Sequence, residues 1–281
     1  MASRTALRQH AILVGTDFSA ASRVAEARAA ELAQRLRATL HVVHAASRLP
    51  PALARRFSSL TEGAPQEALH ARVEALRNAG IDARGHLMHG DPIKALTTKA
   101  RAVATDLIVV GTRGGNVLEA MVGSTAERLI AADQHRVLLA RRKTKGDYRK
   151  VVVAANEESR LREQVAAATF VCARPPTVLH AYEAPFESAL IAHGAKHSEL
   201  GRYTADAKRE AERTMTRLME KAGLAPAQLV LQHGSPLQLL QRFDPASLIV
   251  LSRGRSRARH IIFGSVTRAV VAHGHSDVLL V

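Results

Sequence analysis

Short apolar runs alternate with amphipathic segments along the whole chain. The first run, residues 11–14, precedes Ser19 and a segment to residue 37 in which apolar side chains recur at helical spacing. Serine is a common helix N-cap, so the pattern predicts a buried strand, a capped helix and then further alternation. The remaining predicted strands are 40–44, 86–88, 107–110 and 136–140, and the remaining predicted helices are 66–79, 91–104 and 124–132.

The same series of landmarks returns in the second half. Residues 151–155 repeat the apolar run at 12–16, and Asn156 falls where Asp17 stands. Further repeated landmarks are 178–180 for 42–44, 229–236 for the third strand and its His-Gly-Asp-Pro end, 248–254 for the fourth strand and its turn, and 277–281 for 136–140. Landmarks repeated in one order indicate an internal duplication. The charged segment between the copies predicts a domain at 1–142, a linker at 143–150 and a domain at 151–281.

The largest difference between the copies is an insert at 183–225, after the second strand of the second copy. It contains a predicted long helix at 200–222 that ends at Gly223, a residue suited to a helix C-terminus.

Strands that alternate with helices predict an α/β fold with parallel sheets and right-handed crossovers. In such open sheets, ligands bind beyond the carboxyl ends of the strands where the strand order reverses. We expect strands one and four to flank this crevice, so that Asp17 faces the turn at 111–114.

Glycines stand at that turn. The apolar run 107–110 ends in Gly111-Thr112-Arg113-Gly114-Gly115, and Gly123-Ser124-Thr125 precedes the next helical pattern. Glycines let backbone N–H groups approach a ligand, and a helix N-terminus adds unpaired N–H groups and partial positive charge. The stretch therefore predicts an anion site, best suited to phosphate.

These motifs resemble those of the universal stress protein family, in a tandem two-domain arrangement that covers nearly the whole chain. The nucleotide-binding branch of that family carries G-x2-G-x9-G-[S/T] after strand four and an acidic residue after strand one. The resemblance implies two tandem Rossmann-like domains, each an open five-stranded parallel sheet of order 3-2-1-4-5 flanked by helices. It also implies a cytoplasmic stress-response regulator that binds an adenine nucleotide, ATP, and contacts an unknown protein partner.

The first copy keeps Gly111-x2-Gly114, with eight residues instead of nine before Gly123. The resemblance then assigns nucleotide binding to Asp17, Val43, Gly111, Arg113, Gly114, Gly123, Ser124 and Thr125. The second copy has the nine-residue spacing from Gly254 to Gly264, but Leu251 replaces the first glycine and Asn156 replaces the acidic residue. Its weaker site consists of Arg253, Gly254, Gly264 and Ser265.

Each feature has a plainer alternative. Asp17 can serve only as a helix cap, Val43 only as a core residue, and Ser124 and Ser265 only as N-caps. The alternative function is a scaffold of the same fold without nucleotide, or a protein that binds another small ligand or a metal, through the insert. A third class is a binder of anionic polymers or membrane surfaces, because the formal net charge is +15.

Composition narrows these classes. Aromatic residues make up 3% of the chain and are not interleaved with the basic residues, so dedicated nucleic-acid binding is not expected. No apolar run approaches the roughly 18 residues of a membrane span, and the N-terminus lacks the apolar segment of a signal peptide, so we expect a cytoplasmic protein without membrane contact. The single cysteine, Cys172, excludes an intramolecular disulfide and predicts a core residue.

The chain has 14 histidines. His193 and His197 have i, i+4 spacing and are low-ranking metal candidates; no metal is expected. His44 and His180 occupy equivalent strand ends, as do His89 and His233. The repeated placement predicts either a role in the crevice or the same structural hydrogen bond in both copies, and we favour the hydrogen bond. The motifs of common nucleotide hydrolases and serine hydrolases are missing, so turnover is not expected, although slow ATP hydrolysis or autophosphorylation stays open.

The fifth strand of each copy ends its sheet. Bare sheet edges invite pairing, so we expect these two strands to pair within the chain, with a homodimer as a further option.

Overall fold

The computed structural model describes residues 9–46, 63–112, 128–130, 135–141, 146–156, 160–225, 228–255, 261–262 and 264–281. The chain divides into two compact units, Met1–Gly146 and Asp147–Val281. We call them the first and second unit and describe each by itself.

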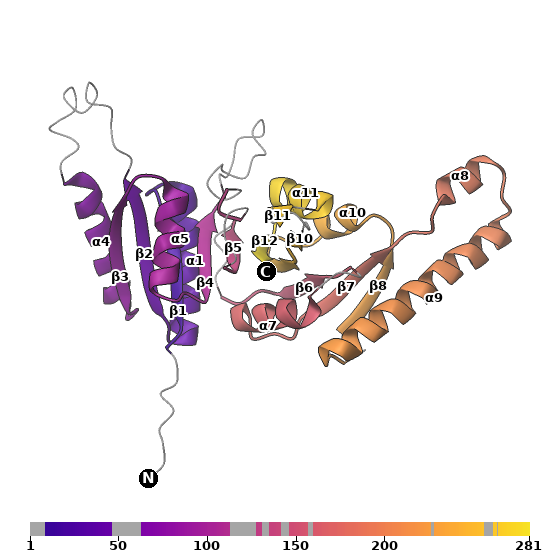
Figure 1. Cartoon of the computed structure of the whole chain (residues 1–281), viewed down its shortest axis with the longest axis horizontal. Helices are drawn as coiled ribbons and strands as arrows, with labels where there is room; N and C mark the ends of the chain where they lie inside the picture. The colour runs from indigo at the N-terminus through magenta and orange to yellow at the C-terminus, as the bar shows by residue number, and fades with distance from the viewer. Residues whose placement is uncertain are drawn as a thin grey trace, which may run out of the picture. The chain divides into compact units, whose positions relative to one another are not determined.

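The first unit is a parallel sheet of order β3-β2-β1-β4-β5 with helices packed against it (Figure 1). Its elements are β1 (Ala11–Thr16), α1 (Ala20–Leu36), β2 (Thr39–Ala46), α4 (Ala64–Asn78), β3 (Ala83–His89), α5 (Pro92–Ala102), β4 (Leu107–Gly111) and β5 (Val137–Ala140). A short helical stretch at 128–130 is also described.

The second unit repeats this order as β8-β7-β6-β9-β12. Its elements are β6 (Lys150–Ala154), α7 (Leu161–Val171), β7 (Thr177–Tyr182), α8 (Glu187–Ala192), α9 (His197–Ala222), β8 (Leu229–His233), α10 (Pro236–Gln241), β9 (Ser247–Leu251), β10 (Gly254–Arg255), β11 (Ile261–Ile262), α11 (Ser265–His273) and β12 (Asp277–Leu280). Both units therefore have the implied order 3-2-1-4-5, and the α/β fold class is confirmed. The pairing of the two fifth strands stays a prediction.

Helices cover both faces of the first sheet because neighbouring strand residues point in opposite directions. Thr16 contacts Glu26 of α1, whereas an added Cβ on Gly15 would lie 3.1 Å from Leu96 of α5. The core between these layers is small and aliphatic. Ile12, Leu13 and Val14 are fully buried, as the low aromatic content requires.

Local signals in the sequence fix the ends of α1. The side chain of Ser19 accepts a hydrogen bond from the backbone nitrogen of Ser22 at 3.2 Å, which confirms the predicted cap. Arg37 ends the helix in the left-handed region at φ 50°.

Tyr148 belongs to the core of the second unit, although it lies within the predicted linker. It is 2% exposed, and its hydroxyl donates to Oδ2 of Asp277 at 2.8 Å. Strand β6 then begins at Lys150.

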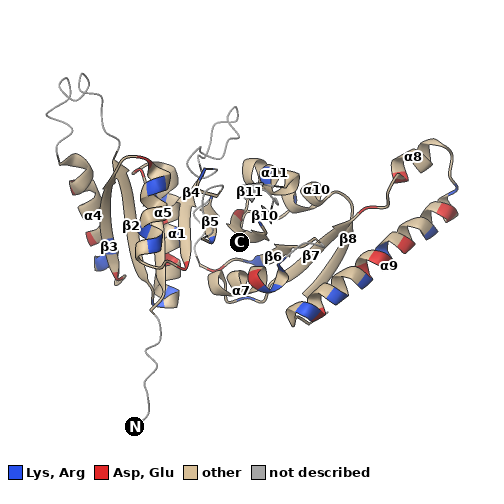
Figure 2. Cartoon of the chain, in the orientation of Figure 1, with Lys and Arg blue, Asp and Glu red and all other residues tan. Residues whose placement is uncertain are grey.

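The insert forms two helices rather than one. α9 ends at Gly223 in the left-handed region, as predicted, but α8 was not predicted. α9 packs on β7, β8 and α7, and Met215 and Met219 are its buried residues. α8 also contacts α9. Figure 2 shows acidic and basic residues alternating along α9, so the insert carries no block of one charge. Phe186, just before α8, is 81% exposed.

Among the described residues, no helix is both long enough and apolar enough to span a membrane.

Candidate functional site

The strand registers define which residues of the two units are equivalent. Gly15 pairs with Val43 on β2, and Ala154 pairs with Leu179 on β7. Val43 and Leu179 therefore hold equivalent places at the carboxyl end of each second strand.

His44 and His180 follow these residues and make the same hydrogen bond. His44 Nδ1 lies 2.8 Å from the carbonyl oxygen of Thr16, and His180 Nδ1 lies 2.9 Å from that of Ala155. A carbonyl only accepts, so Nδ1 donates in both cases. The predicted shared structural bond is confirmed for this pair.

His89 and His233 do not share one within the described part of the chain. His233 Nε2 lies 2.9 Å from Oε2 of Glu187, so it ties the strand end to α8 of the insert. His89 is exposed at the end of β3. The prediction for the second pair was wrong because the insert supplies a partner that the first unit lacks.

The register corrects the alignment of the fourth strands. Val110 pairs with Leu139, and Leu251 pairs with Leu280 at the same level. Beyond them, the amides of Thr112 and Arg253 donate to Ala140 and Val281 at 3.4 and 2.9 Å. Ser252, and not Leu251, therefore occupies the place of Gly111. Alignment of the two copies on their G-x2-G glycines is wrong by one residue at this strand end.

Gly111 is required by packing. A Cβ built on it would lie 2.4 Å from the carbonyl oxygen of Ala21 in α1. In the second unit, α7 begins at Leu161, six residues after Ala155, whereas α1 begins four residues after Thr16, and Ser252 stands at the position equivalent to Gly111. The glycine at this turn thus has a structural role that is independent of any ligand.

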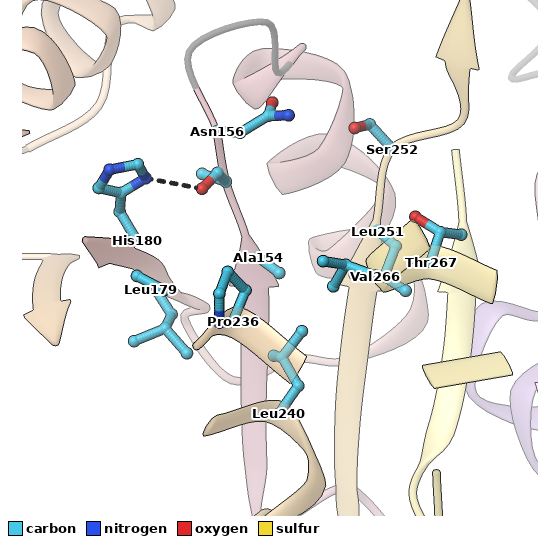
Figure 3. A pocket seen from close by; sticks show the side chains of 12 residues that line it. Ala154, Asn156, Leu179, His180, Pro236, Leu240, Leu251, Ser252, Val266 and Thr267 are labelled. Carbon is cyan, nitrogen blue, oxygen red and sulfur yellow. Dashed lines mark hydrogen bonds between the residues drawn. The ribbon is translucent and has the colours of Figure 1, made fainter. Parts of the chain in front are cut away.

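A pocket of about 240 Å³ lies at the carboxyl ends of β6, β7 and β9 (Figure 3). We call it the second-unit pocket. Its apolar walls come from Leu179, Leu240, Leu251 and Val266, and its polar groups come from Asn156, His180, Ser252 and Thr267. Figure 3 shows Asn156 and Ser252 toward one end of the pocket and Leu240 toward the other. The volume is slightly below the roughly 300 Å³ at which small-molecule sites usually begin.

The residues predicted for the weaker site lie beside this pocket, and their neighbours line it. Gly254 pairs with Ile262 in a short antiparallel hairpin that the sequence did not predict. Gly264 caps α11 and Ser265 is its first residue, so Ser265 is not the N-cap. Val266, Thr267 and Ser252 were missed because the motif names glycines and hydroxyls, whereas the pocket is formed by the residues next to them.

In the first unit, Asp17 lies directly beyond β1 and is exposed. Its Oδ1 accepts from the backbone nitrogen of Ser19 at 3.0 Å, so it does not cap α1. Burial raises the pKa of this carboxyl, but hydrogen bonds from Ser19 and Ser22 lower it more, and the pKa lies below its ordinary value. Asp17 is therefore an anion near neutral pH.

Val43 is 1% exposed and pairs with Gly15 in the sheet, so it is a core residue of the first unit. A Cβ built on Gly15 would lie 3.1 Å from Leu96, so α5 packs over this position. Arg113, Gly114, Gly123, Ser124 and Thr125 lie outside the described residues.

An ion pair joins the start of α5 to the helical stretch at 128–130. Arg128 donates to Oδ2 of Asp91, the N-cap of α5, at 2.8 Å. By the repeat, Ser235 and Ala269 take these places in the second unit. The second unit therefore lacks the equivalent ion pair between α10 and α11.

The histidine spacing in the insert does not form a metal site. His193 ends α8 and His197 begins α9, with Gly194 at φ 80° between them, so they do not share a helix. Within the described ranges, no group of three or more His, Cys, Asp or Glu side chains could hold a metal ion.

Comparisons with known proteins agree with the duplicated fold. The model of the "Universal stress protein family" matches residues 9–141 and again 147–281. Universal stress protein A homolog 1 of Coxiella burnetii is 33% identical over 125 residues, which cover 42% of this chain and 87% of that protein. A universal stress protein structure from Archaeoglobus fulgidus is 18% identical, covers 98% of each chain and has a TM-score of 0.66, which supports the fold alone. A universal stress protein solved in complex with cAMP is 27% identical, with a TM-score of 0.38, over 47% of this chain and 97% of that one.

Proposed function

The chain belongs to the universal stress protein family, and from that premise we propose that it binds an adenine nucleotide at the carboxyl ends of its strands. We propose further that it is a cytoplasmic stress-response protein, and that the bound nucleotide regulates contacts with a protein partner.

The observation that carries this proposal is the second-unit pocket. Leu179, Leu240 and Val266 offer apolar surface of the kind that covers a flat base, and polar groups stand nearby. His180 lines the pocket and donates from Nδ1 to the Ala155 carbonyl, which leaves Nε2 as the acceptor nitrogen of the neutral ring. The N-terminus of α11 follows at Ser265 and favours a negatively charged group.

The first unit supports a second site. Asp17 offers an exposed carboxylate at the end of β1, and the sequence motif from Gly111 to Thr125 is the more complete of the two. We therefore propose that Asp17, Val43, Gly111, Arg113, Gly114, Gly123, Ser124 and Thr125 bind nucleotide there, as the resemblance implies.

Titration calorimetry with ATP, AMP and adenosine tests the function. Ala181, which lines the second-unit pocket, and Ala45 are equivalent, partly exposed strand-end residues, so A181W and A45W form a matched pair. We expect each variant to remove one binding event while the melting temperature stays near that of the parent. Absence of binding at millimolar ATP, or binding that neither tryptophan changes, contradicts the proposal.

The second candidate is a scaffold that acts without nucleotide. The neutral Asn156 and the Ser252 side chain at the glycine position favour it, as does the exposed Phe186 of the insert. Mass spectrometry of small molecules released from the purified protein separates the two functions. Stoichiometric adenine nucleotide excludes the scaffold.

A further inference from the structure

We propose that Glu26 is a positioning residue for nucleotide binding by the first unit: through the hydroxyl of Thr16 it holds the turn that presents Asp17 to the ribose of the ligand. This inference rests on the proposed function of that unit.

The contacts form a short chain from the core to the surface. Glu26 is 6% exposed, and its Oε1 accepts from the Thr16 hydroxyl at 2.5 Å. Thr16 Oγ1 in turn accepts from the backbone nitrogen of Phe18 at 3.1 Å. Asp17 lies between Thr16 and Phe18 in the chain. The buried carboxylate of Glu26 therefore fixes the hydrogen bond that spans Asp17.

The direction of the Thr16 proton matters. A hydroxyl has one proton and two lone pairs. The Thr16 hydroxyl donates its hydrogen bond to Glu26, so its lone pairs can accept from the Phe18 amide. Ser22 Oγ, 3.2 Å from Thr16 Oγ1, lies 3.1 Å from the carbonyl oxygen of Ser19 and can donate to it. Without the Glu26 acceptor, the Thr16 hydroxyl can turn its proton to Ser22 Oγ, 3.2 Å away, which redirects its lone pairs away from the Phe18 amide.

The Phe18 conformation needs such support. Its φ is 62°, in the left-handed region that a bulky residue rarely adopts and that is strained for a residue with a Cβ. The turn is held on the other side by the Ser19 amide, which donates to Asp17 Oδ1 at 3.0 Å. The Phe18 ring also packs against His44, with the ring centroids 4.4 Å apart and the planes tilted by 34°. Asp17 is thereby fixed at the carboxyl end of β1.

A buried carboxylate is costly unless it is paired. Arg72 of α4 lies 3.7 Å from Oε2 of Glu26 and supplies the counter-charge. The second unit has Ala155 in place of Thr16 and Asn156 in place of Asp17. The second unit thus has neither the threonine hydroxyl nor the aspartate at these two positions, and it still has the same fold. The hydrogen bonds around Thr16 therefore accompany Asp17 and are not required by the fold.

The chemistry of Asp17 identifies the part of the ligand that it meets. An ionised carboxylate only accepts hydrogen bonds and repels phosphate, so it suits the donors of the ligand, the ribose hydroxyls and the adenine amino group, of which we assign it the ribose hydroxyls. The hydrogen bonds that lower the pKa of Asp17 keep it in this form.

The test uses the full chain with A181W, which blocks the second-unit pocket. Calorimetry compares ATP with 2′,3′-dideoxy-ATP for E26Q, E26L, T16S and T16V. Hydrogen bonds to charged groups contribute enough that we expect E26L and T16V to weaken ATP binding about tenfold, with dideoxy-ATP unchanged. E26Q and T16S keep an acceptor and a hydroxyl, respectively, and should retain the affinity of the parent.

The outcomes separate cleanly. Equal weakening for both nucleotides, or no change in either, overturns the positioning role of Glu26. Absence of ATP binding in the A181W background overturns the proposed first-unit site and this inference with it. If E26L does not fold, T16V together with hydrogen exchange of the Phe18 amide decides the question, since the inference requires faster exchange at that amide.

Discussion

His41 Nδ1 lies 2.9 Å from His86 Nε2, and the two rings stack with centroids 5.1 Å apart. Only one proton fits between the two nitrogens, so the pair is stable when at least one ring is neutral. Burial, first, and then the positive charges of Lys99 and Arg84 lower the pKa values of both histidines, and that of His86 falls to about 4. Asp82 acts in the opposite direction on His41.

This pair predicts a pH dependence of stability. The folded-state pKa values lie below the unfolded value of 6.5, so the unfolded chain binds protons first. The contribution is complete above pH 6.5 and is lost as the pH falls toward about 4. We expect a loss of roughly 1–2 kcal/mol after allowance for the solvent screening of His86. Urea unfolding of wild type and H41T/H86V at pH 7.5 and 4.5 measures it, since Thr177 and Val230 stand at these places in the second unit. Equal pH dependence of both proteins contradicts the prediction.

We expect an alanine side chain to destabilise the protein at Gly111 but not at the equivalent position, Ser252. G111A places a Cβ 2.4 Å from the Ala21 carbonyl oxygen and should destabilise the protein by about 1–3 kcal/mol. S252A, at the equivalent position, should change the unfolding free energy by less than about 0.5 kcal/mol. Urea unfolding without nucleotide compares them. Similar values for the two variants exclude a packing role for Gly111.

We expect removal of the Tyr148 hydroxyl to lower the free energy of unfolding. Y148F removes a donor at 2.8 Å from Asp277, which is 1% exposed, and should cost about 1–3 kcal/mol. Y203F removes the exposed hydrogen bond to the Pro185 carbonyl and should cost less than about 0.5 kcal/mol. Thermal unfolding of both variants checks this. A smaller effect for Y148F than for Y203F contradicts it.

The difference between Asp17 and Asn156 predicts a change in nucleotide affinity. N156D in the A45W background adds a carboxylate beside the second-unit pocket and should tighten ATP binding several-fold, about 3–10 times. D17N in the A181W background should weaken it by a similar factor. Dideoxy-ATP serves as the control for both. An effect of equal size on the control shows that the carboxylate does not meet the ribose.

Much of the fold follows from the sequence because its signals are local. Ser19 caps α1 and Gly223 ends α9 through bonds to neighbours in the chain, and both were predicted. The short helix α8 was missed because it begins after Phe186, whose φ of 60° is left-handed. Phenylalanine rarely adopts that conformation, so the sequence carries no signal for a helix start there.

The candidate site was predicted less well because it depends on strand register. The motif pointed to the carboxyl ends of the fourth strands, but aligning its glycines matched Leu251 to Gly111. Only the backbone pairing of β9 with β12 and of β4 with β5 identifies Ser252 as the equivalent residue. His41 and His86 come from different strands, so their contact could not be found from spacing. The His44 and His180 bonds were predictable because the duplication places both at the same strand end.

The matched level of Val110 and Leu251 also defines where the two halves of the chain can be recombined. A chimera that grafts residues 111–123 onto the second half should replace 252–264, so that each transplanted loop leaves its strand at the same rung of the ladder. A crossover placed by aligning Gly111 with Leu251 would instead rotate the incoming loop to the opposite face of the sheet.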